Sequence, residues 1–350
     1  MIIVPLDRDA RGPAGFSVKV DSNHGANASR VEEIVRSELA RVEQMFDCED
    51  GDSMLSRWIR DPSIDTTDDF EQLLVAALDW QRLSRGAFNV STRRLHRLWE
   101  RAAVSGCRPS PGELHEIVNE IADAPYCLEG GRLRRLRGCD GLDVSAIARG
   151  FAVEAALDQV MRTFGLGGVA VRAHDRQVCR GDAAIATALG QLGDPFGMSH
   201  FVVSDAAATV VSSSGPAGGR RDPVFDPLTG DRAPDHVSVI VVAPDAVTSD
   251  AVAATIRTMG TARALDFVRE LNQPSRRAHP SQFSPGIMVG PIRCRLLDSD
   301  GVLHDSGESF DATQPIRPVD AAVRTRRRRS GGRDRRRLTL PWGGSRTVES

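Results

Sequence analysis

The sequence lacks the features that mark exported and membrane-bound proteins. Its apolar start, MIIVP, gives way at once to charged residues, whereas a signal peptide needs an apolar region of about 7 to 15 residues. No apolar run approaches the roughly 18 to 20 residues that span a bilayer, because charges or glycines interrupt every candidate. These absences predict a cytoplasmic protein that makes no contact with a membrane.

The six cysteines form no recognisable metal-binding or disulfide framework. They stand far apart, and none of them belongs to a CxxC pair. Because the expected cytoplasm is reducing, we predict neither a zinc site nor disulfide bonds.

Two sequence signatures of common folds are also missing. No GxGxxG motif follows a predicted strand, and no repeat of fixed period occurs. These absences disfavour a doubly wound dinucleotide fold and a solenoid. With 350 residues, 41% hydrophobic and 26% charged, the chain has enough apolar material for one large domain or two small ones.

The C-terminal segment differs in kind from the rest of the chain. Residues 323–337 hold nine arginines against one aspartate, a local charge of +8 in a chain whose net charge is −2. From Asp311 onward the sequence loses apolar periodicity and gains proline, glycine and like-charge runs, which is typical of disorder. We therefore predict a folded domain over residues 1–310 and an arginine-rich disordered tail over 311–350. The tail predicts weak, non-specific contact with nucleic acid or other anionic partners.

The spacing of apolar residues predicts several helices. Amphipathic patterns with helical periodicity cover residues 30–46 and 70–83. The sequence SPGE at residues 110–113 has the form of a capping box with proline at the first helical position, and it opens a third helix. Residues 146–164 carry a wide apolar stripe and predict the longest helix.

Short β-branched runs predict strands between and after these helices. They cover residues 14–20, 168–172, 201–204, 208–213 and 236–243. A late hairpin is expected over residues 286–298, with its turn around Pro291.

The segment DVSAIARGFAVE, residues 143–154, places an acid and small residues where the longest helix begins. The N–H groups of a first helical turn bind phosphate oxygens, and Arg149 adds a positive charge. The alternative is structural, in which Asp143 or Ser145 only caps the helix.

Asp250 lies in a second such segment, SDAVAAT, which opens another short helix after the strand at 236–243. Its carboxylate is an oxygen ligand of the kind that magnesium prefers, and Thr255 offers a nearby hydroxyl. The structural alternative makes Asp250 a helix cap. A third segment, DPLTG at 226–230, has the composition of an ordinary turn, with Thr229 bonding locally.

Taken in order along the chain, six segments resemble the motifs of the ApbE family. DSMLSRW (52–58) resembles D-S-x-x-S-R-x-N, GAFNVSTRRLHRLW (86–99) resembles G-A-F-D-x-T-x-x-x-L-x-x-L-W, and DVSAIARGFAVE (143–154) resembles D-x-G-A-I-A-K-G-Y-A-V-D. SSSG (212–215), FDPLTG (225–230) and SDAVAATIRTMG (249–260) are similar to T-S-G, H-I-I-D-P-x-T-G and A-D-A-L-A-T-A-L-F-V-M-G.

The resemblance implies a fold and a reaction. The fold would be α+β, a T-fold-related single domain of mixed sheets packed with helices, with a groove that binds FAD. The reaction would be a magnesium-dependent transfer of FMN from FAD to a threonine hydroxyl of an acceptor flavoprotein, with release of AMP. Positioning and charge neutralisation dominate such phosphoryl transfers.

The resemblance also assigns roles to residues by position. Asp143 and Asp250 would be the catalytic carboxylates. The FAD-contacting positions would be Ala87, Phe88, Asn89, Asp143, Arg149, Val224 and Ala253. The metal positions would be the carbonyl oxygen of Ala146, the carboxylate of Asp250 and the side chain at residue 254.

The chain departs from the family pattern at several of these positions. Ala254 stands where the family has a metal-binding threonine, and the threonine of this chain comes one residue later, about 100° further round a helix. The other departures are Asn89 for Asp, Arg149 for Lys, Pro223 for His, Ile59 for Asn, and residues 173–175 for G-G-D.

These departures leave three functions open. The first is the FMN transferase, with FAD hydrolysis as a side reaction. The second is a flavin-binding or scaffolding protein that has lost magnesium-dependent catalysis. The third is a protein that binds nucleic acid through its arginine-rich tail. His174 and Asp175 are a candidate general-base pair, against the alternative of a loop histidine with local hydrogen bonds.

Deleting residues 311–350 should leave folding and flavin binding intact, because this segment lacks the apolar surface needed to join a core. Thermal melting and flavin binding of the full chain and the truncated chain check this prediction. A large drop in melting temperature on truncation would show that the folded domain extends beyond residue 310.

Overall fold

An antiparallel sheet forms one layer of the fold in the computed structural model of the chain. Its eight strands follow the order β1-β2-β5-β6-β9-β10-β11-β12. Their bounds are β1 Ile2–Pro5, β2 Phe16–Val20, β5 Gly168–Ala173, β6 Arg176–Gly181, β9 Ala207–Ser212, β10 Ser238–Ala243, β11 Arg293–Leu297 and β12 Leu303–Asp305. Two small hairpins accompany it, β3 (Tyr126–Glu129) with β4 (Arg132–Arg135) and β7 (Ala184–Ala188) with β8 (His200–Ser204).

The structure describes residues 2–5, 16–20, 28–138, 140–173, 176–181, 184–188, 200–204, 207–212, 223–233, 236, 238–273 and 291–306. All of them belong to one unit, Met1–Pro315, and the helices among them are eight. Their bounds are α1 Ala28–Phe46, α2 Met54–Arg60, α3 Asp68–Leu83, α4 Thr92–Ser105, α5 Pro111–Ile121, α6 Ser145–Phe164, α7 Ala246–Arg257 and α8 Thr261–Leu271.

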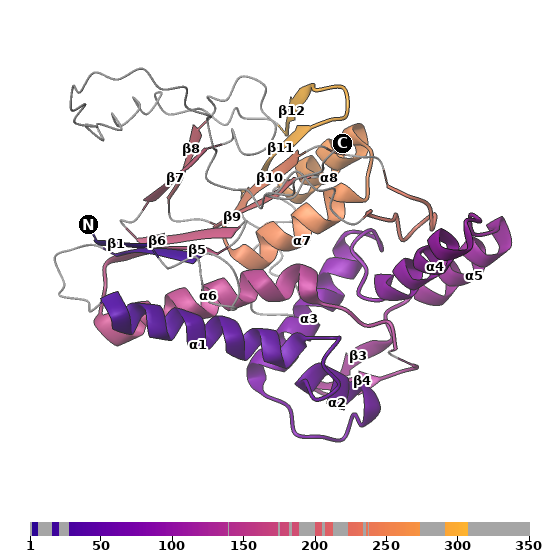
Figure 1. Cartoon of the computed structure of the whole chain (residues 1–350), viewed down its shortest axis with the longest axis horizontal. Helices are drawn as coiled ribbons and strands as arrows, with labels where there is room; N and C mark the ends of the chain where they lie inside the picture. The colour runs from indigo at the N-terminus through magenta and orange to yellow at the C-terminus, as the bar shows by residue number, and fades with distance from the viewer. Residues whose placement is uncertain are drawn as a thin grey trace, which may run out of the picture. The chain divides into compact units, whose positions relative to one another are not determined.

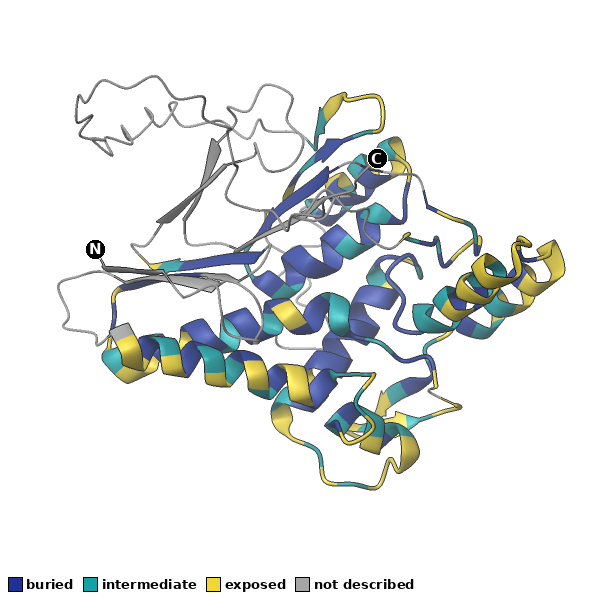
Figure 2. Ribbon diagram, viewed as in Figure 1, coloured by how far each residue is buried: buried dark blue, intermediate teal, exposed yellow. Residues whose placement is uncertain are grey.

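The helices pack against the sheet in successive layers. α6 contacts β5 and β6, while α7 contacts β9 and β10, so these two helices cover the sheet side by side (Figure 1). α1 packs on the far side of α6 and exposes its outer face to solvent (Figure 2). The core between these layers is apolar and includes Val35, Phe46, Leu157, Val241 and Ile256.

Most of the predicted elements are confirmed, and the capping box is complete. The Ser110 hydroxyl accepts a hydrogen bond from the Glu113 N–H, and the Glu113 carboxylate accepts one from the Ser110 N–H. α6 has 20 residues and ends at Gly165, whose φ of 61° is the left-handed conformation that closes a helix.

α3 forms where the periodicity predicted a helix, and ten of its sixteen residues are buried. Of the hairpin expected over residues 286–298, residues 286–290 lie outside the described part of the chain. The second arm is β11, which pairs with β10 on one edge and with β12 on the other. Both edges of β11 are therefore occupied, and the turn that leads out of it lies at residues 298–302. Among the described helices, none combines the length and the apolarity required to cross a bilayer.

The crossing of α6 and α7 depends on a glycine. A Cβ atom at Gly150 would lie 2.6 Å from the carbonyl oxygen of Ala246 and 2.7 Å from Oδ2 of Asp250. Both distances are below those found between real atoms, so the two helices approach each other too closely for any side chain at this position. The close approach brings α7 against the first half of α6.

Replacing this residue, Gly150→Ala, should destabilise the protein by about 1 to 3 kcal/mol, because overpacking outweighs the gain in helix propensity. The matched control is Gly112→Ala in α5, where the new Cβ would meet nothing closer than Ser110 Oγ at 3.9 Å. That change should be neutral or stabilising by up to about 1 kcal/mol. Denaturant unfolding measures both, and equal effects would contradict the close crossing.

Candidate functional site

One pocket collects the residues that the sequence motifs indicated. It has a volume of about 290 Å³ and is called the arginine pocket here, after Arg149, Arg176 and Arg257 in its lining. All ten predicted site positions line it, namely Ala87, Phe88, Asn89, Asp143, Ala146, Arg149, Val224, Asp250, Ala253 and Ala254. They come from the loop before α4, the start of α6, the segment after residue 222 and one face of α7.

Asp143 stands just before α6 and borders the pocket. Its Oδ1 accepts a hydrogen bond of 2.8 Å from the N–H of Ser145, and its own N–H donates to the carbonyl of Val90. The formal N-cap is Val144, which makes no side-chain capping bond. Asp143 thus satisfies one N–H at the helix start, as the structural alternative requires, and still lines the pocket.

Asn89 is held by the protein through both ends of its amide. Nδ2 donates to the carbonyl of Ile121 at 2.8 Å, and Oδ1 accepts from the N–H of Ser91 at 2.7 Å. An ionised aspartate has no proton to donate to the Ile121 carbonyl. Asparagine therefore suits this buried loop, which carries Ala87 and Phe88 into the pocket.

Asp250 is not the cap of its helix, contrary to the structural alternative. The N-cap of α7 is Asp245, whose side chain accepts a hydrogen bond from the N–H of Thr248. Asp250 lies in the second turn and is buried, with its side chain 0% exposed. Its Oδ2 accepts 2.8 Å bonds from Nε of Arg176 and from the N–H of Gly150.

The threonine that follows the predicted metal position lies on another face of α7. Ala253 and Ala254 line the arginine pocket, whereas Thr255 is fully buried and donates its hydroxyl to the carbonyl of Ala251 at 2.6 Å. The offset of one residue therefore removes the hydroxyl from the pocket, as helical geometry requires.

The donors present do not fit a magnesium site of the implied kind. Magnesium prefers several oxygen ligands in octahedral geometry. Here residue 254 offers no oxygen, and the Asp250 carboxylate is already bonded to Arg176 and Gly150. Across the described residues, no group of three His, Cys, Asp or Glu side chains converges on a metal position.

The turn at residues 226–230 directly follows Val224 and Phe225, which line the arginine pocket. Gly230 adopts a φ of 74°, and its carbonyl accepts a hydrogen bond from Nε1 of Trp99. Trp99 stacks on Phe225 with ring centroids 5.2 Å apart. Thr229 bonds locally, as expected for a turn, since its hydroxyl accepts the N–H of Asp231. Docking of the turn on α4 sets the position of Val224 and Phe225 in the lining.

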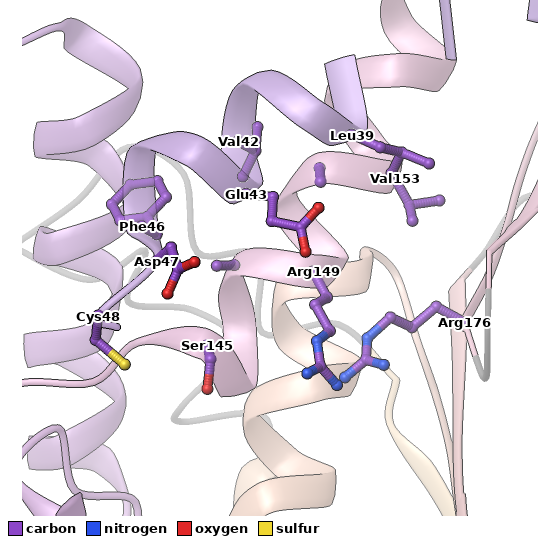
Figure 3. A pocket seen from close by; sticks show the side chains of 12 residues that line it. Leu39, Val42, Glu43, Phe46, Asp47, Cys48, Ser145, Arg149, Val153 and Arg176 are labelled. Carbon is purple, nitrogen blue, oxygen red and sulfur yellow. The ribbon is translucent and has the colours of Figure 1, made fainter. Parts of the chain in front are cut away.

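A second pocket adjoins the first and shares Ser145, Arg149 and Arg176 with it. Its volume is about 200 Å³, and its other walls are largely apolar side chains of α1 and α6. Figure 3 shows the side chains of Arg149 and Arg176 extending into the same space beside these walls. We call it the apolar pocket, lined by Leu39, Val42, Phe46, Ala148, Ala152 and Val153 with Glu43, Asp47 and Cys48 at the end of α1.

Sequence reasoning missed Arg176, Arg257 and the α1 side of the site. Arg257 sits one turn beyond Ala253 on α7, so helical spacing offered a signal for it. Arg176 begins β6 and carries no local signal of a site. His174 and Asp175, the candidate general-base pair, lie outside the described residues.

Glu154 fixes the start of α7 against α6. Both of its carboxylate oxygens accept hydrogen bonds from Nη2 of Arg180, at 2.6 and 2.7 Å, and Oε1 also accepts the N–H of Ala246. Burial raises the pKa of Glu154 to about 7, although Arg180 opposes the shift. The placement of Asp250 in the pocket thus depends on a carboxylate that titrates near neutral pH.

The described residues form an α+β protein in which an arginine-lined pocket adjoins a largely apolar pocket. The chain belongs to the ApbE family, whose sequence model matches residues 14–276. A search of curated proteins found no match to the chain.

Solved structures of similar fold carry the same family name. A flavin transferase ApbE from Vibrio cholerae is 18% identical with a TM-score of 0.63, over 87% of this chain and 96% of that one. The flavinyl transferase ApbE of Pseudomonas stutzeri, in its apo form, is 16% identical with a TM-score of 0.67, over 87% and 95%. An ApbE protein from Thermotoga maritima is 19% identical with a TM-score of 0.69, over 88% and 98%. The chain therefore spans nearly the whole of each relative's fold.

The contribution of Glu154 to the stability of the protein should fall as the pH rises from about 4.5 to about 7. Over this range the folded protein keeps a proton on Glu154 that the unfolded chain has released, because folding raises the pKa from 4.5 to about 7. Glu154→Gln should flatten this part of the pH profile by about 1 to 3 kcal/mol.

Denaturant unfolding at several pH values measures the slope. Glu116→Gln, at an exposed position on α5, is the matched control and should leave the slope unchanged. An identical profile in the Glu154→Gln and wild-type proteins would contradict the raised pKa.

Proposed function

We propose that this protein is an FAD:protein FMN transferase, which transfers FMN from FAD to a hydroxyl group of an acceptor flavoprotein. The observation that carries the proposal is the arginine pocket itself, in which all ten predicted site positions meet. Membership of the ApbE family and a fold shared with flavin transferases support it.

The two adjoining pockets suit the two chemical parts of a flavin dinucleotide. Its pyrophosphate is anionic, and three arginines line the arginine pocket against two aspartates. Charge-assisted bonds from guanidinium groups are strong and match phosphate geometry. The ring systems of a flavin dinucleotide are flat and largely apolar. The apolar pocket offers aliphatic and aromatic side chains next to Arg149 and Arg176, which line both pockets.

The transfer is a displacement at phosphorus. The acceptor hydroxyl oxygen forms a bond to the FMN phosphorus, the bond from that phosphorus to the AMP oxygen breaks, and AMP leaves with the electron pair. The arginines stabilise the charge that spreads over the phosphoryl oxygens. Asp143 is the carboxylate of the pocket that pairs with no arginine among the described residues, and in this proposal it accepts the hydroxyl proton.

The threonine identity of the target and the dependence on magnesium come from the family resemblance. The threonine belongs to the acceptor, and the described residues include no feature that selects it. Magnesium would supply charge neutralisation at the pyrophosphate. Because the donors present do not fit such a site, no step is assigned to the metal here.

A second function is favoured by one specific observation. Ala254 contributes no oxygen to the pocket, and Asp250 is engaged by Arg176. These facts support a flavin-binding or scaffolding protein that holds FAD without turnover. The tail offers a third role, weak and non-specific contact with nucleic acid, which is independent of the pocket.

The transferase should attach FMN to an acceptor flavoprotein when FAD is the donor, and attach nothing when FMN or riboflavin replaces FAD. The reason is that only FAD contains the phosphoanhydride bond that the transfer breaks. Mass spectrometry of the acceptor after incubation with each flavin measures the covalent adduct, and fluorescence quenching measures the binding of each flavin.

The control variants separate binding from chemistry. Arg149→Ala should weaken FAD binding by about tenfold or more, since it removes a charge-assisted contact. Arg162→Ala, an exposed arginine on the same helix, should change neither binding nor transfer. FAD binding without any adduct would support the scaffolding function, and equal affinity for all three flavins would contradict both.

A further inference from the structure

The pair of Arg176 and Asp250 is unusual because both charges lie inside the protein. Nε of Arg176 is 2.8 Å from Oδ2 of Asp250, and the two side chains are 7% and 0% exposed. Burying a charge is costly unless a partner compensates it. Each residue therefore depends on the other, and both line the arginine pocket.

The pair occupies the place where the family resemblance implied a divalent cation. The predicted metal donors were the carbonyl oxygen of Ala146 and the carboxylate of Asp250. In an α-helix the N–H of Gly150 points at the carbonyl of Ala146, four residues earlier. Here that N–H donates to Oδ2 of Asp250, so the Asp250 carboxylate lies at this turn of α6. The guanidinium of Arg176 binds the same oxygen.

We propose that Arg176 replaces the divalent cation in this protein, so that the arginine pocket binds the pyrophosphate of a dinucleotide without a metal ion. The proposal rests on the proposed function for the identity of that ligand. The guanidinium neutralises Asp250 through Nε. Its end lies next to that of Arg149 on the side of the apolar pocket (Figure 3), and both arginines line the arginine pocket as well. Five donors in a planar fork allow one guanidinium to serve a carboxylate and a phosphate together.

The charges of the pocket are consistent with this replacement. A magnesium ion on Asp250 would leave a net charge of +1, whereas Arg176 on Asp250 leaves zero. Arg149 and Arg257 line the same pocket and add two positive charges, against one negative charge on Asp143. The five charged residues thus sum to +1 without a metal ion, the sign that an anionic pyrophosphate requires.

A purely structural ion pair is the alternative explanation. It would hold α7 against β6 and leave ligand binding to the other arginines. The two explanations predict different results when the positive charge is removed. In the structural case only stability falls. In the proposed case the exposed carboxylate becomes a binding site for a divalent cation, and dinucleotide binding becomes dependent on that cation.

The experiment compares three variants with the wild-type protein. Arg176→Ala removes the positively charged guanidinium, and Arg176→Lys keeps a positive charge at the same place. Arg162→Ala is the matched surface control. Binding of manganese alone is followed by the electron paramagnetic resonance signal of the free ion, without any flavin. FAD affinity is then measured by fluorescence quenching in EDTA and in excess magnesium.

The wild-type, Arg176→Lys and Arg162→Ala proteins should leave manganese free, and their FAD affinity should change by less than about twofold between EDTA and magnesium. Arg176→Ala should bind one manganese ion per chain. Its FAD affinity in EDTA should fall by about tenfold or more, and magnesium should restore part of the loss. Adding Ala254→Thr to Arg176→Ala should tighten manganese binding further, because it returns an oxygen to the pocket face of α7.

Three results would overturn the replacement of the cation by Arg176. They are stoichiometric manganese binding by the wild-type protein, loss of wild-type FAD affinity in EDTA, and an Arg176→Ala protein that melts cooperatively but binds no manganese. If Arg176→Ala does not fold, the wild-type and Arg176→Lys measurements still decide. Failure of every variant to bind FAD would refute the proposed function, while the manganese results would still test the role of Arg176.

Discussion

The contact between Asp250, Arg176 and Gly150 is the constraint on which the rest of the site depends. It joins the second turn of α7, the first residue of β6 and the first half of α6 through one carboxylate oxygen. Since the charges are buried, the contact forms only when α6 and α7 cross at the distance that a glycine permits. The crossing then sets the positions of Ala253, Ala254 and Arg257 opposite the start of α6.

A second carboxylate, that of Glu154, makes the crossing of α6 and α7 sensitive to pH. Glu154 holds the first N–H of α7 while it pairs with Arg180, and burial keeps its pKa close to neutral pH. Such pairs contribute little net stability compared with apolar packing, but breaking one of them is costly. The α6–α7 interface therefore combines an apolar core with two polar contacts that fix the register of the helices.

The departures from the family pattern have different structural meanings. Asn89 is accommodated, because its amide donates to a buried carbonyl that an ionised aspartate cannot serve. Ala254 deprives the pocket of a hydroxyl group, because the neighbouring Thr255 is buried and donates its hydroxyl to the carbonyl of Ala251 in the same helix. Arg176 lies outside the motifs, yet its guanidinium forms the ion pair with the carboxylate of Asp250. A comparison of motifs alone would count the first two as equal defects.

Local patterns in the sequence were sufficient for most helices and for the capping box at Ser110, and the family resemblance indicated ten of the residues that line the arginine pocket. Periodicity, capping and short motifs act over a few residues, so the linear sequence records them. The partners of β11, the burial of α3 and the apolar pocket beneath α1 depend on packing between distant segments. Arg176 and Asp250 are 74 residues apart, and Gly150 and Asp250 are 100 apart. The sequence thus indicated ten residues of the site, and only the tertiary structure decided which charge neutralises Asp250, because that choice depends on how β6 and two helices meet.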